Sequence, residues 1–140
     1  MRTLVAGGAG FIGSWTVEAL LAAGHEVIVY DNLVSGRRDN IAVVAGNVEL
    51  IEADICDFDR LMAIDGPIDQ IIHLAYPTPL NSRDLRKQFY ETASTGTANL
   101  LELSLRHSAY FLYGSSISVY GRQEELPISE DNPVSPMLIY

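Results

Sequence analysis

The sequence contains one cysteine, Cys56, and no apolar run long enough to cross a bilayer. A single cysteine excludes an intrachain disulfide and a cysteine-based metal site. A membrane-spanning helix needs about 20 consecutive apolar residues, whereas turn residues interrupt every apolar run here. The first five residues lead directly into a strand-like run, without the apolar region and cleavage site of a signal peptide. These absences predict a cytoplasmic protein that does not enter a membrane.

Positive charge is also scarce, with 9 lysines and arginines against 18 acidic residues and a formal net charge of -9. Such a surface repels polyanions, which argues against a nucleic-acid partner. It leaves room for a nucleotide cofactor, because backbone N–H groups at a helix N-terminus hold phosphates without lysine. The histidines have no histidine or cysteine neighbours at ligand spacing, so we expect no metal site.

What the sequence does contain is an alternation of short apolar runs and helix-length amphipathic stretches, over 140 residues that are 48% hydrophobic. We expect parallel strands near residues 3–6, 27–30, 50–53, 70–74 and 110–113. Helices are expected from residue 12 to Gly24, after Asp57, and over residues 83–107, with Ile12, Trp15, Ala19 and Ala22 on one face of the first helix. The pattern predicts an α/β fold, a doubly wound, mostly parallel sheet of the Rossmann type.

Five strands are fewer than a complete doubly wound fold uses. We therefore expect residues 1–140 to be the N-terminal part of a dinucleotide-binding domain, truncated before the last strands and the substrate domain. Taken alone, the 140 residues should show no turnover and at best weak cofactor binding.

The most informative local pattern is the glycine-rich stretch at residues 7–13, Gly-Gly-Ala-Gly-Phe-Ile-Gly. It follows an apolar strand and opens an amphipathic helix. Glycines are needed there for a tight turn, for close approach of the backbone to a pyrophosphate, and for close packing of helix on strand. The stretch predicts a dinucleotide-binding loop.

Asp31 directly follows the second predicted strand. A carboxylate at that position accepts hydrogen bonds from the adenosine ribose hydroxyls and repels a 2′-phosphate, which favours NAD over NADP. Two alternatives remain open. Arg37 or Arg38 could instead pair with such a phosphate, and Asp31 could be an ordinary residue at a strand end.

Together these residues resemble the extended short-chain dehydrogenases, the NAD-dependent sugar-nucleotide epimerases and dehydratases such as UDP-glucose 4-epimerase. The resemblance spans the whole chain. Its motifs are Gly7-x-x-Gly10-Phe11-Ile12-Gly13, Asp31-Asn32-Leu33-x-Ser35-Gly36, Asp54-Ile55, His73-Leu74-Ala75, Gly96-Thr97-x-Asn99-Leu100-Leu101-Glu102 and Ser115-Ser116-x-x-Val119-Tyr120-Gly121.

The resemblance implies that NAD is the cofactor. The pyrophosphate would bind the glycine loop, the adenosine ribose would bind the segment from Asp31 to Gly36, and Asp54 and Ile55 would flank the adenine. The cofactor-binding residues implied are Gly7, Gly10, Phe11, Ile12, Gly13, Asp31, Asn32, Leu33, Ser35, Gly36, Asp54, Ile55, Leu74, Ala75 and Tyr76.

The resemblance also implies two catalytic residues, Ser116 and Tyr140, with a lysine one helical turn beyond Tyr140. A phenol with a pKa of about 10 is a poor base at neutral pH, and a lysine at i+4 would stabilise its phenolate. A serine would hydrogen-bond the developing alkoxide. Alternatively, Ser116 is a capping serine at a strand end and Tyr140 a core aromatic residue.

Two departures from the family pattern bear on the activity. Ala93 stands where the family usually has an asparagine, and Ile117-Ser118 replaces the Asp-Glu pair of the 4,6-dehydratases. We expect an epimerase or dehydratase acting on a nucleotide sugar, foremost a 4-epimerase that works as a homodimer when complete. The alternatives are a nucleotide-sugar decarboxylase or reductase on the same scaffold, or a dinucleotide-binding protein without catalysis.

Overall fold

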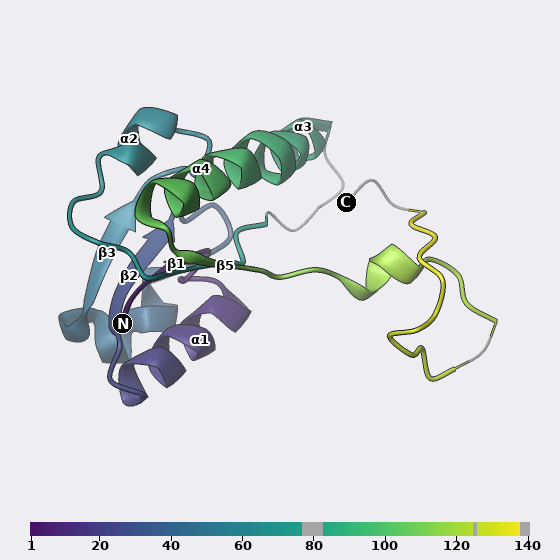
Figure 1. The fold of residues 1–140 in the computed structure, drawn as a ribbon, viewed down its shortest axis with the longest axis horizontal. Helices are drawn as coiled ribbons and strands as arrows, with labels where there is room; N and C mark the ends of the chain where they lie inside the picture. Colours follow the sequence, from purple (N-terminus) through teal and green to yellow (C-terminus); the bar gives the residue numbers. More distant parts are fainter. Residues whose placement is uncertain (77–82, 125, 138–140) are drawn as a thin grey trace.

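The computed structural model describes residues 1–76, 83–124 and 126–137, with only the backbone described for residues 83–86. Its centre is a five-stranded parallel sheet in the order β3-β2-β1-β4-β5 (Figure 1). The strands are β1 (Arg2–Ala6), β2 (Glu26–Asp31), β3 (Val48–Glu52), β4 (Gln70–His73) and β5 (Tyr110–Tyr113). The predicted doubly wound parallel sheet is confirmed.

Helices connect the strands and cover the sheet. They are α1 (Phe11–Ala22), α2 (Phe58–Met62), α3 (Arg83–Glu91) and α4 (Thr97–His107), with short 3-10 segments η1 (Arg38–Asn47) and η3 (Ile117–Tyr120). A π-helical segment, η2 (Thr92–Gly96), joins α3 to α4, so the helix predicted over residues 83–107 contains a wide turn. Asp57 caps α2 as expected, since its carboxylate accepts a hydrogen bond from the Arg60 N–H at 3.0 Å.

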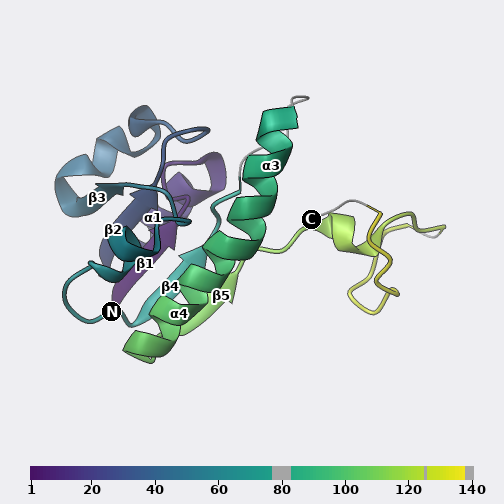
Figure 2. The same ribbon diagram turned by 90° about the horizontal axis from the view of Figure 1, so that it is seen from above.

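The two faces of the sheet carry separate cores, and helices cover both (Figure 1). On one face α1 and η1 contribute Val17 and Ile41, which pack on β1 and β2. On the other, α2 and α4 contribute Leu61, Leu100 and Leu103. The strand order reverses between β1 and β4, and in such sheets the crevice for a ligand opens at the carboxyl ends of the strands at that point. Beyond β5, residues 114–124 and 126–137 extend away from the sheet (Figures 1 and 2).

The rotation of α1 about its own axis differs from the apolar spacing in the sequence. Ile12 and Trp15, on the predicted apolar face, are each 65% exposed, whereas Gly13, Ser14 and Val17 are buried. The reason is contact with the glycine loop: a Cβ on Gly13 would lie 2.0 Å from the Gly7 carbonyl oxygen. Close approach of backbones therefore determines which face of α1 meets the sheet, and the large apolar side chains remain outside.

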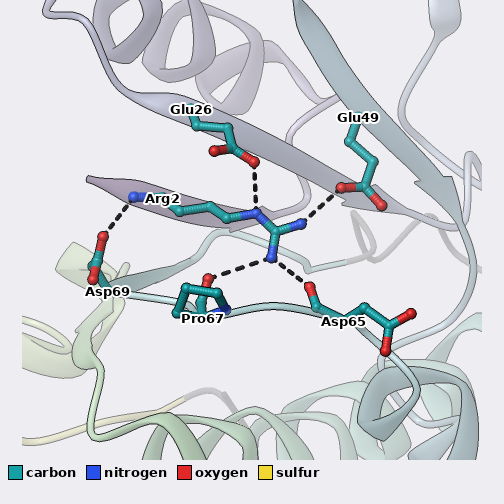
Figure 3. A network of polar contacts seen from close by, with 6 residues as sticks. All are labelled: Arg2, Glu26, Glu49, Asp65, Pro67 and Asp69. Atoms are coloured by element: carbon teal, nitrogen blue, oxygen red, sulfur yellow. Dashed lines mark hydrogen bonds and ion pairs between the residues drawn. The ribbon is translucent and has the colours of Figure 1, made fainter.

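The opposite end of the sheet, at the amino ends of the strands, is tied together by Arg2 (Figure 3). Its guanidinium forms ion pairs with Glu26 on β2 at 2.7 Å and Glu49 on β3 at 2.9 Å. It also donates hydrogen bonds to the carbonyl oxygens of Asp65 at 2.6 Å and Pro67 at 3.3 Å, in the loop before β4. One side chain thus links β1 to two strands and a loop, far from the crevice.

Candidate functional site

A cleft of about 540 Å³ opens at the carboxyl ends of the strands, where the strand order reverses. Every predicted cofactor-binding residue lines it except Leu33 and Gly36. The segments that meet there lie far apart in the sequence: the glycine loop, the end of β2, the turn after β3 and the ends of β4 and β5. The residues brought together are Gly7, Gly10, Phe11, Ile12, Gly13, Asp31, Asn32, Ser35, Asp54, Ile55, Leu74, Ala75 and Tyr76.

The glycine loop forms the floor of the cleft. Gly7 has a φ of 82°, and a Cβ there would lie 2.6 Å from the backbone carbon of Leu74, so a larger residue is excluded. The first i→i−4 bond of α1 runs from the Ser14 N–H to the Gly10 carbonyl oxygen at 3.0 Å. The preceding N–H groups, at residues 11–13, have no helical acceptor and lie at the cleft. This arrangement fits a pyrophosphate.

Asp31 lies at the end of β2 and is only 7% exposed. Its carboxylate accepts hydrogen bonds from the Ala9 N–H at 3.0 Å and the Leu33 N–H at 2.9 Å. Gly36 packs against it, since a Cβ there would lie 2.7 Å from Oδ1. Leu33 and Gly36 therefore act on the site by holding the carboxylate. A carboxylate has about four acceptor positions, so its remaining ones suit two ribose hydroxyls.

The two arginines considered as phosphate partners do not line the cleft. Arg38 forms an ion pair with Glu52 on β3, and the Arg37 N–H donates to the Ala9 carbonyl oxygen at 3.0 Å. The cationic alternative for the ribose site therefore has no support in the geometry.

Asn32 and Asp54 form the polar edge of the same end of the cleft. The Asn32 amide donates to Asp54 Oδ2 at 2.9 Å, and the Cys56 N–H donates to Asp54 Oδ1 at 2.9 Å. Burial by itself raises the pKa of Asp54, but these hydrogen bonds outweigh it and the pKa lies below its usual value. Asp54 is therefore ionised at neutral pH, and Ile55 beside it lines the cleft although its side chain belongs to the core.

Sequence reasoning missed several residues that line the cleft. Val34 and Ala53 add apolar surface at the end formed by β2 and β3, while Gln88 and Thr92 reach the cleft from the helical run after β4. Gln88 and Thr92 are four residues apart on a predicted helix, so their shared face was readable from the sequence. The sequence did not show which part of the molecule that face contacts. The remaining lining residues are Tyr30, Gly114 and Ser115.

The two predicted catalytic residues are placed differently. Ser116 does not line the cleft, although its neighbour Ser115 does. The Ser116 hydroxyl oxygen accepts a hydrogen bond from the Ser118 N–H at 3.2 Å, and the hydroxyl donates to Ser118 Oγ at 3.1 Å, which caps η3. Tyr140 lies outside the described residues. The catalytic assignment of both residues stays a prediction.

The described residues include no group of three or more histidine, cysteine, aspartate or glutamate side chains arranged to hold a metal ion. Over the same part of the chain, no helix combines the length and apolar character needed to cross a membrane.

Known proteins similar to this chain include several enzymes of sugar nucleotides. UDP-glucuronic acid decarboxylase 1 of Danio rerio is 38% identical over 147 residues, which cover 99% of this chain and 34% of that protein. UDP-glucose 4-epimerase of Mycolicibacterium smegmatis is 40% identical over 149 residues, which cover 100% of this chain and 47% of that protein. dTDP-glucose 4,6-dehydratase of Streptomyces niveus is 38% identical over 151 residues, which cover 100% of this chain and 45% of that protein.

Solved structures of sugar-nucleotide enzymes and related proteins also match this chain. The X-ray structure of Pal from Bacillus thuringiensis matches with a TM-score of 0.89 and 34% identity, over 97% of this chain and 46% of that one. UDP-glucose 4-epimerase from Bifidobacterium longum, in complex with NAD+ and UDP, matches with a TM-score of 0.84 and 29% identity, over 96% and 43%. The chain thus spans between a third and a half of the length of these relatives.

The profile of the NAD dependent epimerase/dehydratase family matches residues 3–140, almost the entire chain. This match, together with relatives up to 40% identical over the whole chain, shows that the chain belongs to the NAD-dependent epimerase/dehydratase family.

Proposed function

We propose that this chain forms the NAD-binding part of an enzyme that transforms a nucleotide-activated sugar, with 4-epimerisation as the leading reaction. The observation that carries the proposal is the cleft, in which the free N–H groups of α1 and the held carboxylate of Asp31 converge. Family membership supports the same conclusion. Bound NAD would supply the acceptor for a hydride taken from the sugar.

In this proposal the N–H groups of Phe11 and Ile12 bind the pyrophosphate, and Asp31 accepts hydrogen bonds from the adenosine ribose. Asp54 and Ile55 flank the adenine, while residues 74–76 face the nicotinamide end. All of these residues line the same cleft, which supports their assignment to one cofactor site.

For the chemical step, we propose that Tyr140 takes the hydroxyl proton of the sugar as hydride leaves the carbon, and that Ser116 hydrogen-bonds the developing alkoxide. Ser116 would have to exchange its hydrogen bond with Ser118 for one to the substrate. In 4-epimerisation the hydride and the proton then return to the keto sugar, the hydride on the opposite face, so no net oxidation occurs.

The test is Tyr140→Phe in the full-length protein. Turnover of UDP-glucose should fall by about 10² to 10⁴, the usual contribution of a positioned acid–base, and Ser116→Ala should cost less. NAD affinity should survive both changes, and Tyr110→Phe, on an exposed tyrosine, serves as the control. Unchanged turnover in Tyr140→Phe would reject the tyrosine as the base.

A decarboxylase is the second candidate, because relatives named UDP-glucuronic acid decarboxylase are about as similar to this chain as the named epimerases. Product analysis separates the two. UDP-glucose converted to UDP-galactose supports epimerisation, whereas CO₂ released from UDP-glucuronate supports decarboxylation. Binding of NAD without turnover of any sugar nucleotide would support the non-catalytic alternative, for which Ala93 is the motivating residue. A homodimer and a cytoplasmic location stay predictions from the sequence.

A further inference from the structure

Three aromatic rings meet at the carboxyl ends of β4 and β5. The imidazole of His73 stacks on the phenol of Tyr76, with ring centroids 5.0 Å apart and planes 14° from parallel. The Tyr113 ring meets both edge-on, 5.4 Å from His73 and 5.9 Å from Tyr76. Tyr76 lines the cleft, so the two other rings form the support behind one of its walls.

The hydrogen bonds of His73 determine which of its ring nitrogens carries the proton. His73 Nδ1 accepts the Ala75 N–H at 3.3 Å, which leaves the single proton of the neutral ring on Nε2. His73 Nε2 lies 3.0 Å from Thr97 Oγ1 and donates to it. Burial lowers the pKa of His73 to about 4, so the ring is neutral at physiological pH and this direction is fixed.

The two phenols are joined by a hydrogen bond of their own. Tyr76 donates its hydroxyl proton to the Tyr113 hydroxyl oxygen. Burial and the bond to Tyr113 raise the pKa of Tyr76. The Tyr76 hydroxyl is therefore held by Tyr113 on β5, and its ring stacks on His73 at the end of β4.

We propose that Tyr113 is a positioning residue that holds Tyr76 as a binding wall for the nicotinamide riboside half of NAD. This inference rests on the proposed function. Asp31 and the N-terminus of α1 define the part of the cleft that holds the adenosine and the pyrophosphate. A dinucleotide that starts there must continue past the end of β4, where Tyr76 stands. ADP ends at the pyrophosphate and does not reach it.

Comparing the affinities for NAD and ADP therefore measures the contribution of the Tyr76 wall alone. Calorimetric titration of full-length Tyr113→Phe should show NAD binding weakened about three- to tenfold, the usual effect of one lost hydrogen bond, with ADP affinity changed less than about twofold. The matched control is Tyr110→Phe, on the same strand but 77% exposed and at the other end. It should bind both ligands as the unchanged protein does.

A double-mutant cycle tests whether the bond between the two hydroxyls carries the effect. Tyr76→Phe should weaken NAD binding as Tyr113→Phe does, and the double variant should lose no more than either single one. Additive losses would overturn the inference. So would equal weakening of NAD and ADP, because general damage to the fold affects both, and circular dichroism checks the fold independently. If the unchanged protein binds ADP and NAD equally poorly, the proposed function fails instead.

Discussion

At the scale of single residues, the carboxylate of Asp31 is the most constrained group in the cleft. Two backbone N–H groups hold it and Gly36 packs against it. Gly36→Ala should push the carboxylate away, because the new Cβ would lie 2.7 Å from Oδ1. We expect NAD affinity to fall about tenfold, measured by titration.

The chain offers a matched control for this change. A Cβ at Gly46 would meet no atom within 4 Å, so Gly46→Ala should leave NAD affinity unchanged. An equal effect of the two substitutions would show that the contact between Gly36 and Asp31 does not shape the site.

Cofactor preference follows from the same carboxylate. A 2′-phosphate would meet the negative charge of Asp31, and neither nearby arginine lines the cleft. NAD should therefore bind at least about tenfold more tightly than NADP, a difference of about 1.4 kcal/mol. Parallel titrations measure it. A preference for NADP would mean that Arg37 or Arg38 moves to the ligand on binding.

His73 should make stability depend on pH. Its pKa is lowered from 6.5 to about 4 in the folded chain, so between these values the unfolded chain binds a proton that the folded one does not. The contribution is present above pH 6.5 and is lost as the pH falls towards 4, by about 3 kcal/mol in total. Denaturation of unchanged and His73→Gln protein at pH 7.5, 6 and 5 measures it. The variant should show the smaller decline, and parallel curves would contradict the prediction.

At the scale of elements, the Arg2 side chain joins β1, β2, β3 and the loop before β4 (Figure 3). Arg2→Met keeps much of the aliphatic length and removes every one of these polar contacts. We expect the free energy of unfolding to fall by about 1–3 kcal/mol, because the ion pairs and hydrogen bonds of a side chain that is only 15% exposed are lost together. The cleft lies at the other end of the strands, so NAD affinity should be unaffected.

Lys87→Met is the control for this substitution. Lys87 forms an exposed i,i+4 pair with Glu91 at 3.5 Å, and such pairs contribute about 0.3–0.5 kcal/mol. Chemical denaturation of both variants compares them. Equal losses of stability would show that the Arg2 network is no stronger than an ordinary surface ion pair.

The helices also show how far periodicity reaches. Spacing of apolar residues identified α1 and its extent, but the helix meets the sheet through Gly13 and Val17 and leaves Trp15 outside. Periodicity reports which residues share a face. It does not report which face a close glycine contact will select.

At the scale of the whole molecule, that outward face of α1 is a large apolar surface. Phe11 is 80% exposed, and an open groove runs along Phe11, Ile12, Trp15, Thr16, Ala19 and Leu20. Patches of this kind promote association. Residues 1–140 expressed alone should therefore self-associate as concentration rises, in sedimentation velocity experiments.

Two substitutions test the cause. Trp15→Gln should reduce the association, whereas Val43→Gln, at an exposed valine on η1 outside the groove, should not. A chain that stays monomeric at high concentration would contradict the prediction, as would equal effects of the two changes.

The sequence by itself determined the alternation of strands and helices, the glycine loop and the acidic residue after the second strand, because each depends on neighbours in the chain. Only the tertiary structure decided that Gln88 and Thr92 reach the cleft, that Ser115 lines it while Ser116 caps η3, and that Tyr76 meets Tyr113. These contacts depend on strand order and register, which pair His73 with Tyr113 across β4 and β5. Tyr76 and Tyr113, which are 37 positions apart in the sequence, come together there because two parallel strands end side by side.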